Sequence, residues 1–165
     1  MTCSSSSQDS HTQHFLAGVF VPILLLCFGS ATVVQAQNAE QAFTWTADDP
    51  DLKWTPCVEV WDWMPEGCAF AALQGDPAQP NADVFFRLPG GAVVPHHWHT
   101  SAERMVLISG QLEVDYDDQE PVVMRAGTYA YGPAGLPHVT TCQSAESCVL
   151  FIAFEEPADA VPVED

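Results

Sequence analysis

The chain has 165 residues, about the size of one ordinary domain, and 47% of them are apolar, which is enough to bury a core. Acidic residues outnumber basic residues by 22 to 4, so the formal net charge at pH 7 is −18. Four cations cannot neutralise many phosphates, and an anionic membrane surface would repel the chain, so nucleic acid and anionic lipid are excluded as partners. The composition instead predicts ligands that are neutral, cationic or bound through a metal.

An uncharged stretch covers residues 15–39, and its first half is strongly apolar. Val34 and Ala36 have the small or branched side chains that a signal peptidase accepts, so we interpret residues 1–36 as a signal peptide cleaved after Ala36. The first fourteen residues contain Asp9 and no Lys or Arg, unlike the positive start of an ordinary signal. The alternative is therefore an uncleaved membrane anchor, since the stretch is long enough to span a bilayer. The first interpretation predicts an exported protein, periplasmic or extracellular, and only the second predicts contact with a membrane.

Four of the six cysteines follow the leader, at Cys57, Cys68, Cys142 and Cys148. An even number of cysteines in an exported chain predicts two disulfides. Sequence order suggests Cys57 with Cys68 and Cys142 with Cys148, although four cysteines allow three pairings. The second pair is the better candidate, because its members flank a polar turn between two expected strands and can face each other across a hairpin.

Residues 37–82 are expected to form an N-terminal arm of short strands and loops. Within the arm, residues 52–64 hold three tryptophans and alternate in a way that predicts a short strand, with the tryptophans in the core or over a lid. Proline and glycine are frequent in residues 65–81, which predicts turns there.

After the arm the chain has the pattern of an all-β domain. Strands are expected at residues 83–88, 91–99, 104–109, 111–116, 121–125, 128–131, 138–142 and 147–154, with a tight hairpin turn at Ser109-Gly110. Short strands separated by glycine and proline predict a sandwich or a barrel over residues 83–154. Residues 155–165 are acidic and contain two prolines, so a mobile tail is expected.

The four histidines that follow the leader are the main chemical signal. His97 and His99 are two residues apart, so on a strand they project from the same face, whereas His96 projects from the other face as a surface or supporting residue. Glu103 follows four residues after His99, and His138 lies far along the chain. Three imidazoles and one carboxylate suit a divalent transition metal (Fe, Mn, Ni, Cu, Co or Zn) and are too rich in nitrogen for Mg or Ca.

Two spacings resemble the two sequence motifs of the cupin superfamily. The first is Gly91, five residues, His97, one residue, His99, three residues, Glu103, six residues and Gly110. The second is Gly127, five residues, Pro133, Ala134, Gly135, two residues and His138. The resemblance covers residues 83–154. Upstream of them, Pro65-Glu66-Gly67 and Ala71–Pro77 also resemble small exported single-domain bacterial cupins. The resemblance implies a double-stranded β-helix, the cupin jelly-roll barrel, with one metal held inside it by His97, His99, Glu103 and His138.

The second motif departs from the cupin pattern at Cys142, where asparagine is usual. The usual asparagine is not a metal ligand, so the predicted ligand set is unchanged. If Cys142 pairs with Cys148, the substitution serves stability in an oxidising compartment. The alternative is a thiolate ligand to the metal.

The resemblance to dioxygenase cupins implies a metal-dependent oxygenase that acts on a small neutral organic molecule. Glu103 is the candidate catalytic residue, either remaining bound to the metal or detaching to act as a base. The alternative is a non-catalytic extracytoplasmic protein that binds or senses a metal or small ligand, because no pair of nucleophile and base stands out. A sugar isomerase or epimerase is the third hypothesis, with few cations to bind a sugar phosphate.

The apolar residues that support the substrate site would be inward-facing aromatics, although packing in the core is the favoured role of each one and contact with substrate the alternative. The candidates are Phe85, Tyr129, Tyr131, Phe151 and Phe154. The oligomeric state stays open, with a homodimer as one option, because the edge of a small jelly roll commonly pairs with a second copy.

Overall fold

A computed structural model of the chain describes residues 41–164, so the leader expected over residues 1–36 lies outside the described residues. The elements are β1 (Thr55–Pro56), the 3-10 helix η1 (Cys57–Glu59), β2 (Ala69–Gln74), β3 (Asp83–Leu88), β4 (Val93–Trp98), β5 (Glu103–Ser109), β6 (Gln111–Tyr116), β7 (Val122–Arg125), β8 (Tyr129–Gly132), β9 (His138–Cys142), β10 (Cys148–Phe154) and β11 (Val161–Pro162). No helix among the described residues is long and apolar enough to cross a membrane.

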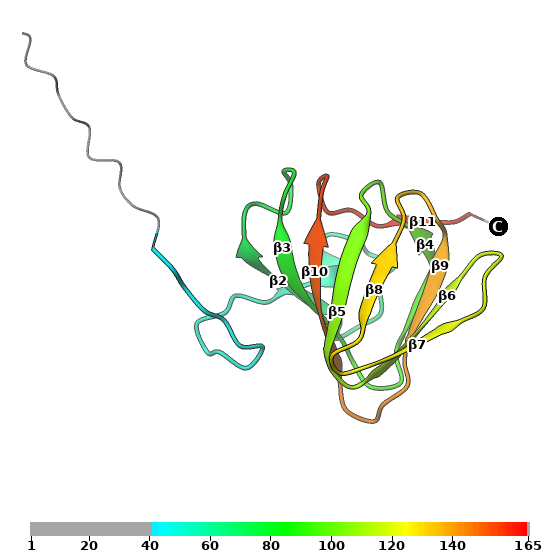
Figure 1. Cartoon of the computed structure of the whole chain (residues 1–165), viewed down its shortest axis with the longest axis horizontal. Helices are drawn as coiled ribbons and strands as arrows, with labels where there is room; N and C mark the ends of the chain where they lie inside the picture. The colour runs from blue at the N-terminus through cyan, green and yellow to red at the C-terminus, as the bar shows by residue number, and fades with distance from the viewer. Residues whose placement is uncertain (1–40, 165) are drawn as a thin grey trace, which may run out of the picture. The chain divides into compact units, whose positions relative to one another are not determined.

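The strands form two antiparallel sheets. One sheet has the order β1-β2-β3-β10-β5-β8, and the other has the order β11-β4-β9-β6-β7. Figure 1 shows the two sheets curving toward each other, with β5 and β8 opposite β9 and β6. The all-β prediction, a jelly-roll barrel, is confirmed.

The main core fills the space between the two sheets. Leu88, Leu107 and Leu150 from one sheet, with Leu112 and Met124 from the other, are at most 2% exposed. These residues alternate with outward-facing neighbours along their strands, as the pleat requires. Burial of each such side chain contributes about 1.5–3 kcal/mol, so this layer fixes the frame in which the site residues lie.

Residues 45–54, in the first part of the expected N-terminal arm, cover part of the outer face of the six-stranded sheet. Trp45, Leu52 and Trp54 pack there with Phe85 and Phe151 as a second apolar cluster. The guanidinium carbon of Arg87 lies 4.2 Å from the centre of the Trp54 ring, a cation–π contact. This first part of the arm therefore packs against the outside of the sheet.

The turn predicted at Ser109-Gly110 is present, but its two strands do not pair as a hairpin. β5 belongs to one sheet and β6 to the other. Gly110 has a φ of +88°, and a side chain there would meet Ser144 and Cys148 at 3.0 Å or less. A glycine is needed at this position because the chain passes sharply between the sheets beside another segment.

Both expected disulfides are present, Cys57–Cys68 and Cys142–Cys148. The hairpin expected for the second pair is wrong, because β9 and β10 lie in different sheets. The bond between Cys142 and Cys148 therefore ties the two sheets together where the chain crosses between them.

The two ends of the domain differ most from expectation. Of the strand expected within residues 52–64, only the two residues of β1 are present. Cys57 starts η1 instead, and a turn from Trp61 to Met64 follows, because the Cys57–Cys68 disulfide folds the chain back. β2 lies within residues 65–81, which were expected to be turns. Residues 155–165, expected to be a mobile tail, instead contain β11, which pairs with β4.

Candidate metal centre

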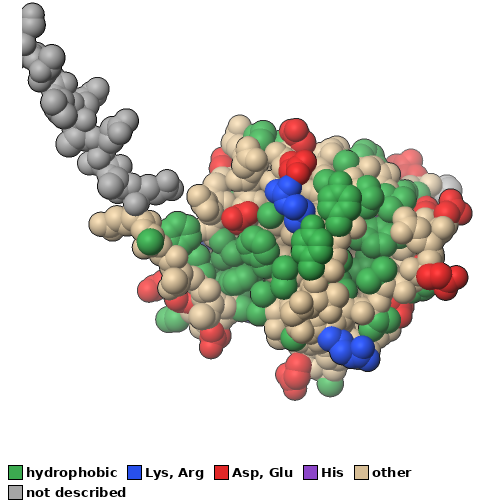
Figure 2. Space-filling view, viewed as in Figure 1, with side chains coloured by type: hydrophobic (Ala, Val, Ile, Leu, Met, Phe, Trp, Pro, Cys, Tyr) green, Lys and Arg blue, Asp and Glu red, His purple; other side chains and the backbone are tan. Residues whose placement is uncertain are grey.

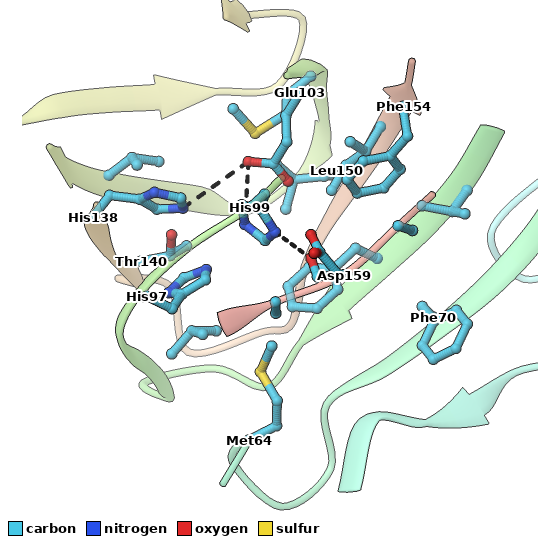
Figure 3. A pocket seen from close by; sticks show the side chains of 18 of the residues that line it. Met64, Phe70, His97, His99, Glu103, His138, Thr140, Leu150, Phe154 and Asp159 are labelled. Carbon is cyan, nitrogen blue, oxygen red and sulfur yellow. Dashed lines mark hydrogen bonds and ion pairs between the residues drawn. The ribbon is translucent and has the colours of Figure 1, made fainter. Parts of the chain in front are cut away.

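The four side chains predicted to bind a metal converge inside the barrel (Figure 3). His97 lies on β4 and His99 directly follows its end. His138 begins β9, the neighbour of β4, and its Cα is the register partner of the Cα of His97. Glu103 begins β5 in the facing sheet and points toward the histidines. Three strands from two sheets thus place these side chains around one point.

The donor atoms of the four side chains lie close together. One ring nitrogen from each of His97, His99 and His138 falls within a group whose members are at most 4.8 Å apart. Glu103 Oε2 is 3.4 Å from His99 Nε2 and 4.0 Å from His138 Nε2. All four residues are buried. Small movements of these side chains would bring the four donors to about 2.0–2.2 Å from one ion.

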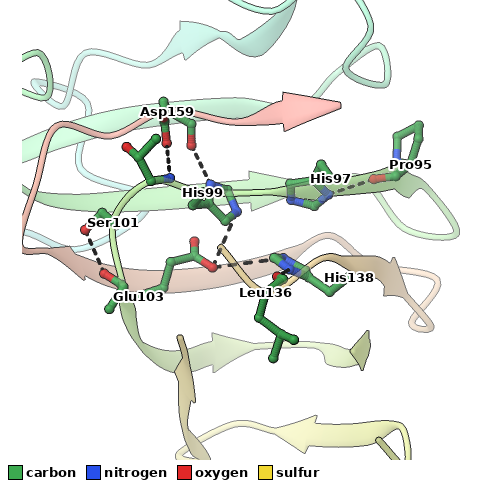
Figure 4. A network of polar contacts seen from close by, with 10 residues as sticks. Pro95, His97, His99, Ser101, Glu103, Leu136, His138 and Asp159 are labelled. Carbon is green, nitrogen blue, oxygen red and sulfur yellow. Dashed lines mark hydrogen bonds and ion pairs between the residues drawn. The ribbon is translucent and has the colours of Figure 1, made fainter. Parts of the chain in front are cut away.

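Each imidazole is oriented by a hydrogen bond on its Nδ1 side (Figure 4). His97 Nδ1 is 2.7 Å from the carbonyl oxygen of Pro95, and His138 Nδ1 is 3.1 Å from that of Leu136. His99 Nδ1 is bonded to the carbonyl oxygen of Asp159. A carbonyl only accepts, so each Nδ1 carries the proton and each Nε2 lone pair is free for a metal. The donor set therefore fits a transition metal.

Burial favours the neutral form of His97 and His138, which is the form that a metal requires. Burial and the neighbouring His138 and His99 lower the pKa of His97 to about 3. Burial also lowers the pKa of His138, although the nearby Glu103 carboxylate acts in the opposite direction. Because neutral imidazole is the ligand form, little proton release from these two residues opposes metal binding near pH 7.

Tyr116 lies beside this centre. Its ring centroid is 5.0 Å from that of His138, and its side chain is 5% exposed. Among the described residues its hydroxyl has no hydrogen-bond partner. Burial, with the Glu103 carboxylate nearby, raises the pKa of Tyr116, so its hydroxyl is protonated at neutral pH. The buried hydroxyl is thus a hydrogen-bond donor beside the His138 ring.

A cavity of about 70 Å³ opens onto the four side chains. Its apolar wall includes Trp61, Met64, Phe70, Leu150 and Phe154. Thr140 and Asp159 add polar atoms, and no Lys or Arg of the described residues lines it. The volume exceeds that of one water site several times, so a small organic molecule fits beside the metal centre.

Other residues singled out in the sequence lie away from the centre. His96 points outward, with its Nε2 2.9 Å from Asp117 Oδ1, as expected of a surface residue. The thiolate alternative for Cys142 is wrong, because Cys142 is bonded to Cys148.

The prediction of inward aromatics is correct only for Phe154. Phe85 and Phe151 pack under the arm on the outer face, and Tyr129 and Tyr131 are 60% and 54% exposed. Figure 2 shows large apolar side chains gathered on the outer face of the six-stranded sheet. β8 presents its small residues inward because Tyr116 and Glu103 occupy the space inside Gly132.

Sequence reasoning missed Asp159 and Tyr116. Asp159 lies 60 residues after the histidine it supports and in the expected tail, so no local spacing connects the two. Tyr116 alternates regularly with its neighbours in β6 and looks like an ordinary core residue.

Comparisons with known proteins agree with this architecture. Residues 47–157 match the family described as the ChrR cupin-like domain. No curated protein matches the chain in sequence.

Solved structures with the same fold have low sequence identity to the chain. The DMSP lyase DddQ from Ruegeria pomeroyi is 19% identical with a TM-score of 0.57, over 68% of this chain and 61% of that one. The polyketide cyclase RemF from Streptomyces resistomycificus is 18% identical with a TM-score of 0.57, over 74% and 87%. A variant of Bacillus subtilis oxalate decarboxylase is 22% identical with a TM-score of 0.51, over 65% and 28%. The chain thus spans less than two thirds of the lyase, and these likenesses concern the fold.

Proposed function

The chain belongs to the ChrR cupin-like domain family, and from this premise we propose that it is a metal-dependent enzyme, an oxygenase acting on a small neutral organic molecule. One observation carries the proposal. Three buried imidazoles, each with its Nδ1 bonded to a backbone carbonyl, bring one nitrogen each within 4.8 Å of the others, and the Glu103 carboxylate lies beside two of them at an apolar cavity.

His97, His99, Glu103 and His138 are the proposed ligands of one metal. Nitrogen donors with one carboxylate accept Fe, Mn, Ni, Cu, Co or Zn, and the ligand types do not choose among these. When bound, the metal supplies a Lewis-acidic and, for iron, nickel, manganese or copper, redox-active centre with positions open to substrate and dioxygen.

Glu103 has two roles in the proposal. As a ligand it supplies the one negative charge of the donor set. Released from the metal, its carboxylate can accept a proton from a substrate held in the cavity. Burial and the Glu103 carboxylate keep the Tyr116 hydroxyl protonated by raising its pKa, so this hydroxyl can donate a hydrogen bond beside the His138 ring.

The lining of the cavity supports a neutral substrate. A carboxylate or phosphate ester would need a counter-ion, but the described cations lie elsewhere: Arg87 stacks on Trp54, and Arg104 pairs with Glu155. The apolar wall formed by Trp61, Phe70 and Phe154 holds water away from the reacting atoms. The predominance of apolar side chains disfavours a sugar, whose hydroxyls need several polar partners.

A non-catalytic metal or small-ligand binder is the second candidate. One observation favours it: apart from the four ligands, Thr140 and Asp159 are the polar residues of the described lining, so few groups remain for proton transfer. Metal content and turnover separate the two candidates.

The test uses residues 37–165 purified with their disulfides formed. Metal is identified by mass spectrometry, and oxygen uptake is followed over a panel of small thiols, phenols and diketones. Uptake that requires iron, nickel, manganese or copper, and that is lost in Glu103→Gln, supports the oxygenase. Stoichiometric metal without oxygen uptake on any panel member supports the binder.

We also propose that the domain works outside the cytoplasm. The two disulfides support this, because such bonds persist in oxidising compartments. Sequencing the N-terminus of the protein recovered from its native cells tests the proposal: a start at Gln37 supports cleavage and export, and an intact leader contradicts cleavage.

A further inference from the structure

One of the three histidines is supported differently from the other two. His97 and His138 each direct Nδ1 to the carbonyl oxygen of the residue two positions earlier, Pro95 and Leu136. That support is local and forms with the strand. His99 instead directs Nδ1 to a carbonyl oxygen 60 residues later, in the C-terminal segment 156–164. The orientation of this one imidazole therefore depends on where that segment lies.

Asp159 is the residue that joins the C-terminal segment to the metal centre. Its carbonyl oxygen accepts the His99 Nδ1–H, and its side-chain Oδ1 accepts the backbone N–H of Thr100 at 2.8 Å. The same residue thus contacts two consecutive residues at the end of β4, once through its main chain and once through its side chain (Figure 4). The second contact fixes the position of the first.

The segment is held on both sides of Asp159. Before it, the hydroxyl of the fully buried Ser101 accepts the N–H groups of Glu155 and Glu156 at 2.9 and 3.1 Å. After it, Val161 is paired with Trp98 in the sheet. The strand β11 has only two residues and so holds the segment weakly. The hydrogen bond from the Thr100 N–H to the Asp159 side chain adds to that support, and a substitution of Asp159 can remove it.

We propose that Asp159 is a positioning residue for the metal centre. By accepting the Thr100 N–H, its carboxylate holds its own carbonyl oxygen against His99, which keeps His99 in the Nδ1–H tautomer with Nε2 directed at the metal. Without this hydrogen bond the imidazole is free to rotate or to take the Nε2–H tautomer, which cannot bind a metal through Nε2. The inference rests on the metal binding of the proposed function and not on turnover.

Metal affinity tests the inference. Loss of a partner that supports a metal-binding histidine typically costs about 10–100-fold in affinity, so Asp159→Ala is expected to weaken Co²⁺ or Zn²⁺ binding by about tenfold or more. Asp159→Asn keeps a side-chain oxygen that can accept the Thr100 N–H, so its affinity is expected to stay close to that of the unchanged protein. Glu164→Ala, an exposed change in the same segment, is the matched control and is expected to have no effect.

Nitrogen NMR of the metal-free protein provides a second measurement. In the unchanged protein the His99 Nδ1 is expected to carry the proton, and Asp159→Ala is expected to give a mixture of tautomers. An Nε2–H tautomer in the unchanged protein would overturn the inference, as would an Asp159→Ala variant that binds metal normally. Equal losses in Asp159→Ala and Asp159→Asn would also overturn it, because charge would then matter and the accepted hydrogen bond would not.

The two proposals fail in distinguishable ways. If the unchanged protein binds no metal, the proposed function fails, but the His99 tautomer and its response to Asp159→Ala still decide the inference. If the unchanged protein and the Asp159→Ala variant bind metal with the same affinity, the inference fails and the proposed metal binding stands.

Discussion

Gly132, the last residue of β8, offers a sharp test of the packing around the metal centre. A Cβ atom there would lie 2.9 Å from the Tyr116 hydroxyl oxygen and 3.4 Å from Glu103 Oε2. Its backbone is outside the left-handed region, so alanine is tolerated by the backbone itself. The Tyr116 ring cannot easily move aside, because it is buried and lies 5.0 Å from the His138 ring. Gly132→Ala must therefore overpack the centre.

We expect Gly132→Ala to lower the free energy of unfolding of the metal-free protein by about 1–3 kcal/mol, the usual cost of an extra methyl group in a filled core. Tyr116→Phe alone is expected to change that free energy little or to raise it, because the hydroxyl it removes has no partner among the described residues. The double variant should recover most of the loss, since removal of the hydroxyl oxygen by Tyr116→Phe leaves room for the new methyl group. The coupling between the two changes is then about 1 kcal/mol or more.

The assay is urea unfolding at pH 7 with a chelator present and the disulfides intact, followed by tryptophan fluorescence in all four proteins of the cycle. Additive effects, or a Gly132→Ala variant as stable as the parent, would refute the reasoning that Tyr116 and Gly132 share one tightly filled space.

Three further predictions concern the rest of the domain. Because burial lowers the pKa of His97 to about 3, the unfolded chain binds more protons than the folded protein between about pH 6.5 and pH 3. The free energy of unfolding of the metal-free protein should therefore fall progressively as the pH is lowered across that range. Urea titrations at several pH values measure this, and a flat profile would contradict it. Replacing both Cys142 and Cys148 by serine should cost about 2 kcal/mol, given the short loop they close, and a denaturant midpoint unchanged from the parent would argue against this role. Leu107→Ala should cost about 2–5 kcal/mol because Leu107 is fully buried between the sheets; thermal unfolding measures the loss, and a cost below that of an exposed control, Val123→Ala, would contradict the core assignment.

Local patterns in the sequence predicted most of the barrel. β3, β6 and β9 begin and end at the predicted residues, because alternating apolar residues between glycine and proline define a strand without reference to its partners. The same patterns do not say which strands pair. The turn at Gly110 and the loop between Cys142 and Cys148 therefore looked like hairpins, whereas each carries the chain from one sheet to the other.

In the candidate site, too, the parts that depend on local spacing were predicted and the parts that depend on packing were not. The spacing of His97, His99 and Glu103 placed them near one another because they share one strand and its connection, and the motif resemblance added His138. The inward face of β8 could not be predicted, because Tyr129 and Tyr131 alternate with Ala130 and Gly132 in a pattern that fits either orientation. Asp159 could not be predicted either, since its contact with His99 depends on the packing of the C-terminal segment.

Metal stoichiometry in a matched pair of variants tests the central claim most directly. His96 and His97 are adjacent, but His96 pairs with Asp117 outside the barrel and His97 is buried at the centre. We predict one transition-metal ion per chain in the unchanged protein and in His96→Ala, and a loss of most of that metal in His97→Ala at equal folded content. Equal metal content in the two variants would contradict the account.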